Sequence, residues 1–218
     1  MAVFASGQMS LALQQEVLAR YLKNTTVITP VATVYVALAT AIPTDAAFTE
    51  VTNANGYVRQ ACAISAVTAG PPSYVTNSGI INFPTVTSTN WAAVLGWGIW
   101  DSGTYGAGNL LFYGTLGVTV AFSAISVATP ASMTTAAHGL TTNGEYFVNV
   151  LTSNATVNAL VATGIGVWPV VVTDGTHLTF PFQCTVTGSG TLMVPTGSVT
   201  LANTDVFQIP ATSITVFL

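Results

Sequence analysis

The chain has 218 residues, 50% of them hydrophobic, so it is long enough to bury a large core without disulfides or metals. Only 5% of the residues are charged, far below the usual quarter, and three basic side chains in a chain of net charge -4 cannot neutralise a phosphate backbone. This composition excludes non-specific nucleic-acid binding and, through its apolar content, intrinsic disorder. No run of about 20 apolar residues is present and no basic segment precedes an apolar run at the start, so we expect neither a membrane span nor a secretion signal.

The first predicted element is an amphipathic helix over residues 10–22. Ser10 is its expected N-cap, and Glu16 and Arg20 stand four positions apart, outside the apolar face. Beyond the helix, short β-branched and aromatic runs alternate with turn residues. The expected strands are, in chain order, residues 32–40, 58–64, 79–83, 94–100, 109–116, 147–151, 167–172, 177–182, 184–186 and 213–217.

Turn signals separate these strands, among them Asn55-Gly56, Asn143-Gly144 and Asp174-Gly175. The pattern predicts a mainly β protein, with an antiparallel β-sandwich as its main domain and one helix at the amino terminus. The helix is expected either to lie across a face of the sandwich or to reach a neighbouring subunit. Two hairpin signals between residues 123 and 193 indicate a small β module inside the longer chain.

Five segments, in order, resemble a family of small tailed-bacteriophage virion proteins described as tail-fibre-like or structural. They are ATVYVALATAIPTDA (32–46), GYVRQA (56–61), IINFPTVTSTNWAAVLGWGIW (80–100), GNLLFYGTL (108–116) and DVFQIPATSITVFL (205–218). The segment between the last two is similar to the "HGL" β modules found as insertions in phage fibre proteins. The resemblance therefore implies a discontinuous host domain, residues 1–122 plus 196–218, carrying an inserted module, residues 123–195. Because a chain that leaves a sheet and returns must keep both crossings close, we place them at residues 117–122 and 195–197.

The resemblance implies a non-enzymatic structural protein on the exterior of a virion, assembled in the cytoplasm of the host bacterium. A compact chain without heptads or fibrous repeats suits a capsid decoration (cement) protein, which we rank first. The alternative is a tail, baseplate or fibre-attached protein, with binding of a bacterial surface glycan as a further option. Its expected partners are other virion proteins, such as the major capsid or tail protein.

Groups that could carry catalysis or hold a metal are few, and we expect no enzyme activity, no cofactor and no metal site. His138 and His177 flank turns in the inserted module and are interpreted as structural residues. No nucleophile motif accompanies them. Cys62 and Cys184 lie far apart in the sequence, and separate buried thiols are favoured over a disulfide.

An aromatic cluster at Trp91, Trp97 and Trp100 has two interpretations. It is either a contact surface that stacks on sugars or on a partner, or simply core packing, which we favour. The two-residue period of a strand places Trp97 and Ile99 on one face and Trp100 on the other. Asp101 is expected to end the strand through an Asx-type turn.

The low charge also predicts self-association. Lysine, which commonly protects exposed strand edges, occurs once, so a partner is expected to cover them. We expect a homo-oligomer, a trimer, in which the amino-terminal helix or the residues before it contact a neighbour. Val3, Phe4 and Met9 are the predicted interface residues, because apolar groups at a chain end have little reason to be solvated.

Overall fold

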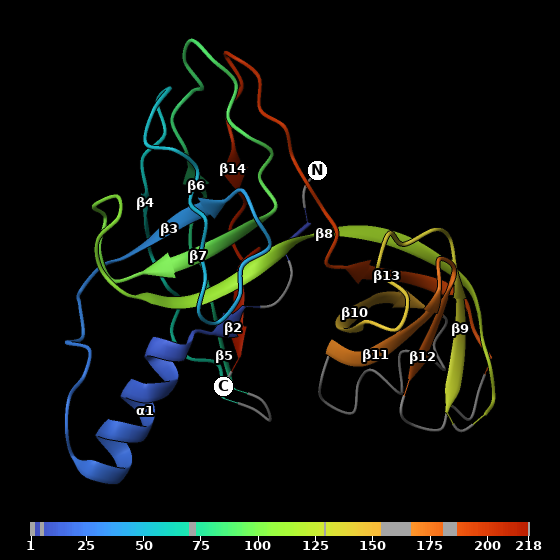
Figure 1. The fold of residues 1–218 in the computed structure, drawn as a ribbon. Coiled ribbons are helices and arrows are strands. Elements are labelled where there is room, and N and C mark those ends of the chain that lie inside the picture. The colour runs from blue at the N-terminus through green and yellow to red at the C-terminus, as the bar shows by residue number, and fades with distance from the viewer. Residues whose placement is uncertain are drawn as a thin grey trace. The chain divides into compact units, whose positions relative to one another are not determined.

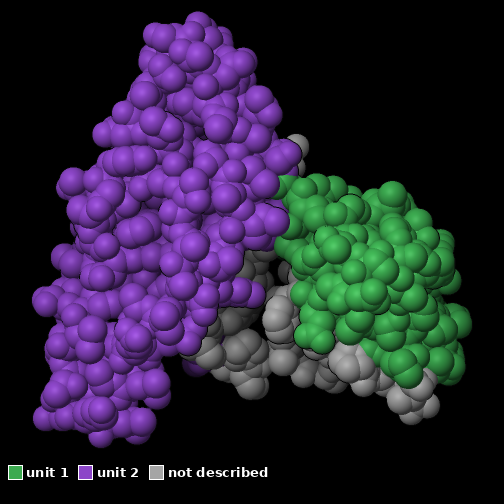
Figure 2. Space-filling view, viewed as in Figure 1, with its two compact units in different colours: residues 1–5, 117–197 green, residues 6–116, 198–218 purple. Residues whose placement is uncertain are grey.

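A computed structural model describes residues 3–4, 7–69, 73–128, 130–153, 167–180 and 187–217. Its described elements are antiparallel strands and one helix, α1 (Leu11–Lys23), which confirms the predicted mainly β class with an amino-terminal helix. The chain divides into two compact units (Figures 1 and 2). Unit 1 comprises Met1–Ala5 and Gly117–Gly197, and unit 2 comprises Ser6–Leu116 and Ser198–Leu218.

The main sheet of unit 2 has the order β4-β3-β7-β8 (Figure 1). Its strands are short and rich in β-branched, aromatic and small residues, which suits a buried pleated surface. The short strand β2 (Gln8–Met9) pairs with β8 through Met9 and Phe112. The bounds of the four main strands are β3 Val34–Ala39, β4 Gln60–Cys62, β7 Gly96–Trp100 and β8 Leu110–Ile125.

Two short antiparallel pairs complete unit 2. They are β6 (Ile81–Asn82) with β14 (Gln208–Ile209), and β5 (Tyr74–Thr76) with β15 (Thr215–Phe217). Gly7 lies close to both the main sheet and β15, because a Cβ added at Gly7 would meet the ring of Trp97 on β7 and the side chain of Val216 on β15. The closing strands β14 and β15 thus pair with strands from the first half of the chain.

Asn77 fixes the end of the chain in unit 2. Its amide nitrogen donates to the carbonyl oxygens of Gly79 and Pro210 at 2.9 and 2.7 Å, and its amide oxygen accepts from the N–H of Ile214 at 2.9 Å. The side chain is fully buried, so these bonds satisfy groups that water cannot reach. One polar side chain thus holds together segments more than 130 positions apart in sequence.

Unit 1 is built on the second part of β8, from Gly117 onward. The pairings run β8-β9-β12-β11-β10-β13 and return from β13 to β8, so each of these strands has two neighbours. β1 (Val3–Phe4) also pairs with β8. The remaining strands are β9 Ala131–Thr135, β10 Glu145–Ser153, β11 Val167–Asp174, β12 His177–Phe180 and β13 Gly190–Val194.

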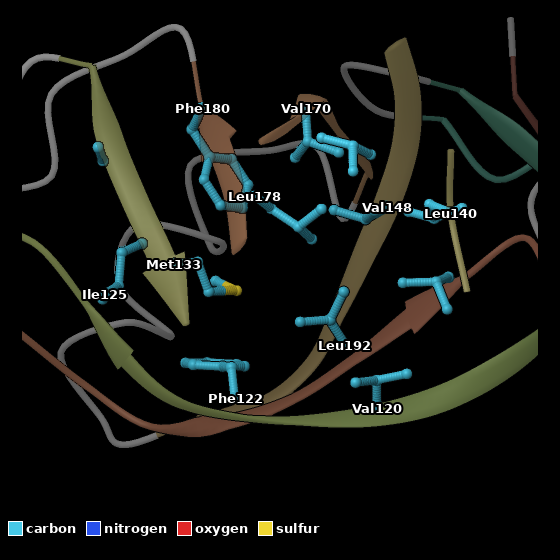
Figure 3. Close-up of a cluster of buried hydrophobic side chains, with 13 residues drawn as sticks. Val120, Phe122, Ile125, Met133, Leu140, Val148, Val170, Leu178, Phe180 and Leu192 are labelled. Carbon is cyan, nitrogen blue, oxygen red and sulfur yellow. The ribbon is translucent and has the colours of Figure 1, made fainter. Parts of the chain in front are cut away.

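The core of unit 1 is a cluster of buried apolar side chains, drawn in Figure 3. Side chains from β8, β10, β12 and β13 point toward one another in that view, because alternate residues of each strand face inward. All of its members belong to unit 1. Its members are Val120, Phe122, Ile125, Ala131, Met133, Leu140, Val148, Val170, Val172, Leu178, Phe180, Leu192 and Val194.

Several boundaries differ from the sequence expectations. The expected strand 109–116 continues to Ile125, so the first predicted crossing between host and module is a continuous strand rather than a loop. The sequence analysis did not predict strands β1, β2, β5, β9, β13 and β14, since each is short or mixes apolar with small polar residues. The expected strand 184–186 lies outside the described residues. Whether unit 1 folds as an independent inserted module stays a prediction.

Among the described residues, no helix combines the length and the hydropathy that a membrane span requires.

Candidate functional site

The three tryptophans singled out in the sequence occupy different environments. Trp91 and Trp97 are 4% and 0% exposed, so neither can present a stacking surface, and core packing describes both. The indole N–H of Trp91 donates to the carbonyl oxygen of Asn55 at 3.0 Å. Trp100 is half-buried on the opposite face of β7 from Trp97 and makes an edge contact with Phe48.

Trp100 also stacks against the guanidinium of Arg59, whose central carbon lies 4.1 Å from the ring centroid. Arg59 is buried and forms a bidentate pair with Glu50, Nε to Oε1 at 2.9 Å and the terminal nitrogen to Oε2 at 2.8 Å. The hydroxyl of Tyr57 donates to the same carboxylate at 2.9 Å and accepts from the N–H of Leu38. Burial, followed by the charge of Glu50, raises the pKa of Tyr57 well above its usual range.

Sequence reasoning did not single out this network, although the sequence contains a signal for it. Tyr57 and Arg59 stand two positions apart in GYVRQA, so an extended backbone places both on one face. An arginine beside an aromatic on the inward face of a strand requires a buried carboxylate partner. Nothing in the sequence says which of the seven acidic residues supplies it, and only the fold identifies Glu50.

Arg59 uses its remaining terminal nitrogen to brace the loop between β7 and β8, residues 101–109. That nitrogen donates to the carbonyl oxygens of Ser102 and Ala107 at 2.8 and 2.9 Å. The carboxylate of Asp101 closes the loop by accepting from the backbone and side-chain nitrogens of Asn109 at 2.6 and 2.7 Å. Asp101 therefore spans the loop from end to end, in place of the local Asx turn that we expected.

We call residues 101–109 the braced loop. Its residues 103–109 are exposed, with Tyr105 at 42%, while the side chains of its supports, Arg59 and Glu50, are 1% and 8% exposed. Gly106 and Gly108 adopt positive φ angles of 70° and 83°, which glycine adopts without steric cost. The exposed part of the loop, residues 103–109, is therefore a surface without charged side chains, made of glycines and other small residues around one tyrosine, a composition also typical of binding loops.

The other candidate site is α1, which begins at the predicted cap. The hydroxyl of Ser10 accepts from the N–H of Leu13 at 3.2 Å and donates to the carbonyl oxygen of Leu110 on β8. The helix ends at Asn24, which has a left-handed φ of 52°. Figure 1 shows α1 projecting away from the strands of unit 2.

The orientation of α1 reverses the usual amphipathic arrangement. Its one buried residue is Glu16, whose carboxylate accepts from the backbone N–H groups of Val27 and Ile28 at 2.5 and 2.7 Å and from Arg20 at 2.7 Å. The bond from Ile28 is the main reason that the pKa of Glu16 is lowered. The apolar side faces outward, and we call it the outer face: Leu11, Val17, Leu18, Tyr21 and Leu22, which are 43%, 37%, 57%, 80% and 76% exposed.

The predicted interface residues at the chain start lie on strands of this same chain. Val3 and Phe4 form β1, and Met9, in β2, is half-buried opposite Phe112. Their backbones thus pair with β8, and their contact with a neighbouring subunit stays a prediction.

Both histidines make local contacts in unit 1. His138 is buried, and its Nδ1 accepts from the N–H of Leu140 at 3.1 Å. His177 bonds through Nδ1 to the carboxylate of Asp174 at 2.8 Å in the turn between β11 and β12. The bond from the N–H of Thr176, ahead of that from His177, lowers the pKa of Asp174 to about 2.

Cys62 is a free thiol buried in unit 2, and burial raises its pKa to about 11. Cys184 lies outside the described residues. Within the parts of the chain that the structure describes, no three histidine, cysteine, aspartate or glutamate side chains gather in a way that could hold a metal ion.

In a comparison with known protein families, residues 8–129 match the model described as Podophage GP4 fiber I protein gp80. The matched segment spans more than half of the chain and contains α1, the main sheet of unit 2 and the braced loop. No curated protein matches the chain.

Proposed function

We propose that the chain is a non-enzymatic component of a fibre on the tail side of the particle. The premise is that the chain belongs to the podophage gp80 fibre family and is a structural virion protein. The observation that carries this proposal is the position of the family match. It covers the part of the chain that presents two outward-facing candidate surfaces, the outer face of α1 and the braced loop.

The two compact units of the chain suit a globular piece attached to a fibre rather than its shaft. Each unit has its own core, and the helix is only 13 residues long, too short for a coiled-coil stalk. A protein of this form serves best as an attachment or adaptor piece, joined to other virion proteins by its exposed surfaces.

The use of the charged groups supports a non-enzymatic role. Arg59 and Glu50 bond each other and the loop backbone, Asp101 bonds Asn109, and Asp174 bonds a neighbouring histidine. Each of these groups is committed to holding a turn or a loop. Catalysis requires titratable groups that converge on a common point instead.

The experiment that tests the location is mass spectrometry of separated heads and tails, with immunogold labelling of intact particles. Recovery with tails and labelling at fibres support the proposal. Recovery with heads alone overturns it in favour of capsid decoration, which the sequence analysis ranked first. The family description, which names a fibre, is our reason for reversing that order.

A second candidate function, binding of a bacterial surface glycan, is favoured by the braced loop. Tyr105 is half-exposed on a loop held at both ends, so sugar binding there would cost little ordering entropy. Because Trp91 and Trp97 are buried, this function depends on Tyr105 rather than on the tryptophans.

A glycan array compares the wild-type protein with the variant Tyr105→Ala. Tyr21→Ala serves as the matched control, because Tyr21 is an exposed tyrosine outside the loop. Binding by the wild type and the control but not by Tyr105→Ala supports the glycan function. Absence of binding by the wild type, or binding that Tyr105→Ala leaves unchanged, contradicts it.

A further inference from the structure

His138 is a buried histidine whose surroundings fit only its neutral ring. It lies in the loop between β9 and β10, residues 136–144, and is 2% exposed. Its Nδ1 accepts from the N–H of Leu140 at 3.1 Å, so the neutral ring carries its proton on Nε2. The Nε2 atom is also buried and meets no hydrogen-bond acceptor among the described residues. The ring therefore has one proton and no place for a second.

The same residue connects its loop to other parts of unit 1. The backbone N–H of His138 donates to the carbonyl oxygen of Gly175, in the turn between β11 and β12, at 3.3 Å. Its carbonyl oxygen accepts from the hydroxyl of Thr196, which follows β13, at 3.1 Å. Leu140, whose N–H the ring accepts, belongs to the core cluster of unit 1 (Figure 3). A change at His138 thus affects the loop, the turn and the core together.

Protonation of His138 opposes this arrangement in two ways. A proton added at Nδ1 points at the N–H of Leu140, so two donors face each other and the hydrogen bond is lost. The ring also gains a positive charge at a position that water does not reach, and burying an unpaired charge costs far more than burying a neutral ring. The charged ring is accommodated only where water solvates it, which requires the loop to leave the core.

No charged group in the described part of unit 1 is placed to neutralise the protonated ring. The other titratable side chains there are Glu145, Tyr146, Asp174 and His177. The carboxylate of Asp174 bonds His177 and its own turn, the hydroxyl of Tyr146 accepts from a loop N–H, and Glu145 is exposed. None of the ion pairs among the described residues includes His138. The neighbouring strands β9 and β13, and β8 from Gly117 onward, contain no titratable side chain.

We propose that protonation of His138 opens unit 1 in mild acid: residues 136–144 detach from Gly175 and from the core, while unit 2 keeps its structure. A solvated histidine takes up a proton below about pH 6.5, so the open form gains about tenfold in population for each pH unit below that value. Both histidines of the sequence belong to unit 1, and histidine is the side chain that ordinarily changes charge between about pH 5 and 8.

This inference goes beyond the proposed function, because it concerns a conformational response of unit 1 and not the place of the protein in the particle. Asp174 does not contribute to the response, since its pKa of about 2 keeps it ionised throughout the range of histidine titration. A protein found in heads is able to open in this way, and a fibre protein is able to lack the response. The two tests therefore fail independently.

Hydrogen exchange of the full chain, measured by mass spectrometry between about pH 7.5 and pH 5.5, tests the proposal. Protection is expressed relative to unstructured peptides at the same pH, because the intrinsic exchange rate itself depends on pH. Peptides covering residues 136–144 report the loop, and peptides covering residues 96–100 report β7 in unit 2. The variant His138→Asn offers an uncharged acceptor close to the position of Nδ1. The matched control is His177→Asn, at the exposed histidine of the same unit.

We expect the protection of residues 136–144 to fall about tenfold between about pH 6.5 and pH 5.5 in the wild type and in His177→Asn, with β7 unchanged. In His138→Asn the protection of the loop should not depend on pH. Constant protection in the wild type overturns the proposal, and so does an equal fall in His138→Asn or in β7. If His138→Asn already loses its fold at about pH 7.5, His138→Gln takes its place with the same expected result.

Discussion

The guanidinium of Arg59 and the carboxylate of Glu50 form a two-pronged ion pair in the interior of unit 2, with 1% and 8% of their side chains exposed. The same guanidinium donates to two carbonyl oxygens of the braced loop. The pair therefore couples the main sheet to an exposed surface, and disturbing it should affect both stability and loop order.

Replacing Arg59 by Met should leave Glu50 as an uncompensated buried charge and cost about 3–5 kcal/mol in free energy of unfolding. Guanidinium denaturation followed by tryptophan fluorescence measures this cost. The double variant Arg59→Met, Glu50→Gln should recover part of it, because the orphaned charge is removed. Equal stabilities for the single and double variants would show that the charge is not the cause.

The carboxylate of Glu16 should make α1 sensitive to acid. Its pKa in the folded protein lies below the ordinary value of 4.5, so its contribution to stability is present above that pH and is lost as the pH falls through the folded-state pKa. The difference in free energy of unfolding between wild type and Glu16→Gln should therefore shrink as the pH is lowered from 7 toward 3. Chemical denaturation at a series of pH values measures it.

The matched control for this acid effect is Asp174→Asn in unit 1. The pKa of Asp174 is lowered from 3.8 to about 2, so its contribution to stability should be present above pH 3.8 and disappear as the pH approaches 2. A difference between wild type and Glu16→Gln that is independent of pH would contradict the role assigned to the Glu16 carboxylate.

The separate core of unit 1 predicts unfolding in two steps. Leu192 is fully buried in that core, and Leu192→Ala should cost unit 1 about 2–5 kcal/mol while leaving the transition of unit 2 in place. Differential scanning calorimetry distinguishes the two transitions. Val118→Ala, at a 43% exposed position in the same strand pairing, should change little.

The same prediction extends to a deletion that joins Ala121 to Thr196. If the module is inserted into an independent host domain, the shortened protein should still unfold cooperatively. A single transition that Leu192→Ala shifts as a whole, or a shortened protein that does not fold, argues against independent units.

Asn77 should be essential for holding the end of the chain. Asn77→Ala leaves the N–H of Ile214 without its acceptor and removes one donor from each of the carbonyl oxygens of Gly79 and Pro210, at a cost of about 1–3 kcal/mol. Asn82→Ala is the control, because Asn82 makes an exposed bond to Gln208 and should matter little. Thermal unfolding of both variants gives the comparison, and equal melting temperatures would refute the role of Asn77.

Cys62 should be chemically inert in the folded protein. Burial raises its pKa to about 11, so almost no thiolate forms at neutral pH, and a thiol reagent should react only after unfolding. The variant Cys184→Ser leaves Cys62 as the single thiol and allows reaction with Ellman's reagent to be followed directly. Rapid labelling under native conditions would contradict its burial.

The sequence by itself determined the mainly β class, the helix at the amino terminus and its Ser10 cap, because these follow from local periodicity and side-chain chemistry. The sequence also places Tyr57 and Arg59 two positions apart, which puts both side chains on one face of an extended backbone. The position of Glu50 against Arg59, the anchoring of Ile214 by Asn77 and the extension of β8 to Ile125 depend on contacts between distant segments, which local patterns do not encode.

The direction of α1 was likewise decided only by the tertiary structure. The sequence shows an apolar face and a polar face, and the ordinary expectation buries the apolar one. Two backbone N–H groups beyond the helix need an acceptor, and Glu16 supplies it, so the polar side turns inward and Leu18 and Leu22 turn outward. These hydrogen bonds hold the helix in this orientation against its hydrophobic periodicity, because leaving the buried N–H of Ile28 without an acceptor would cost about 1–3 kcal/mol.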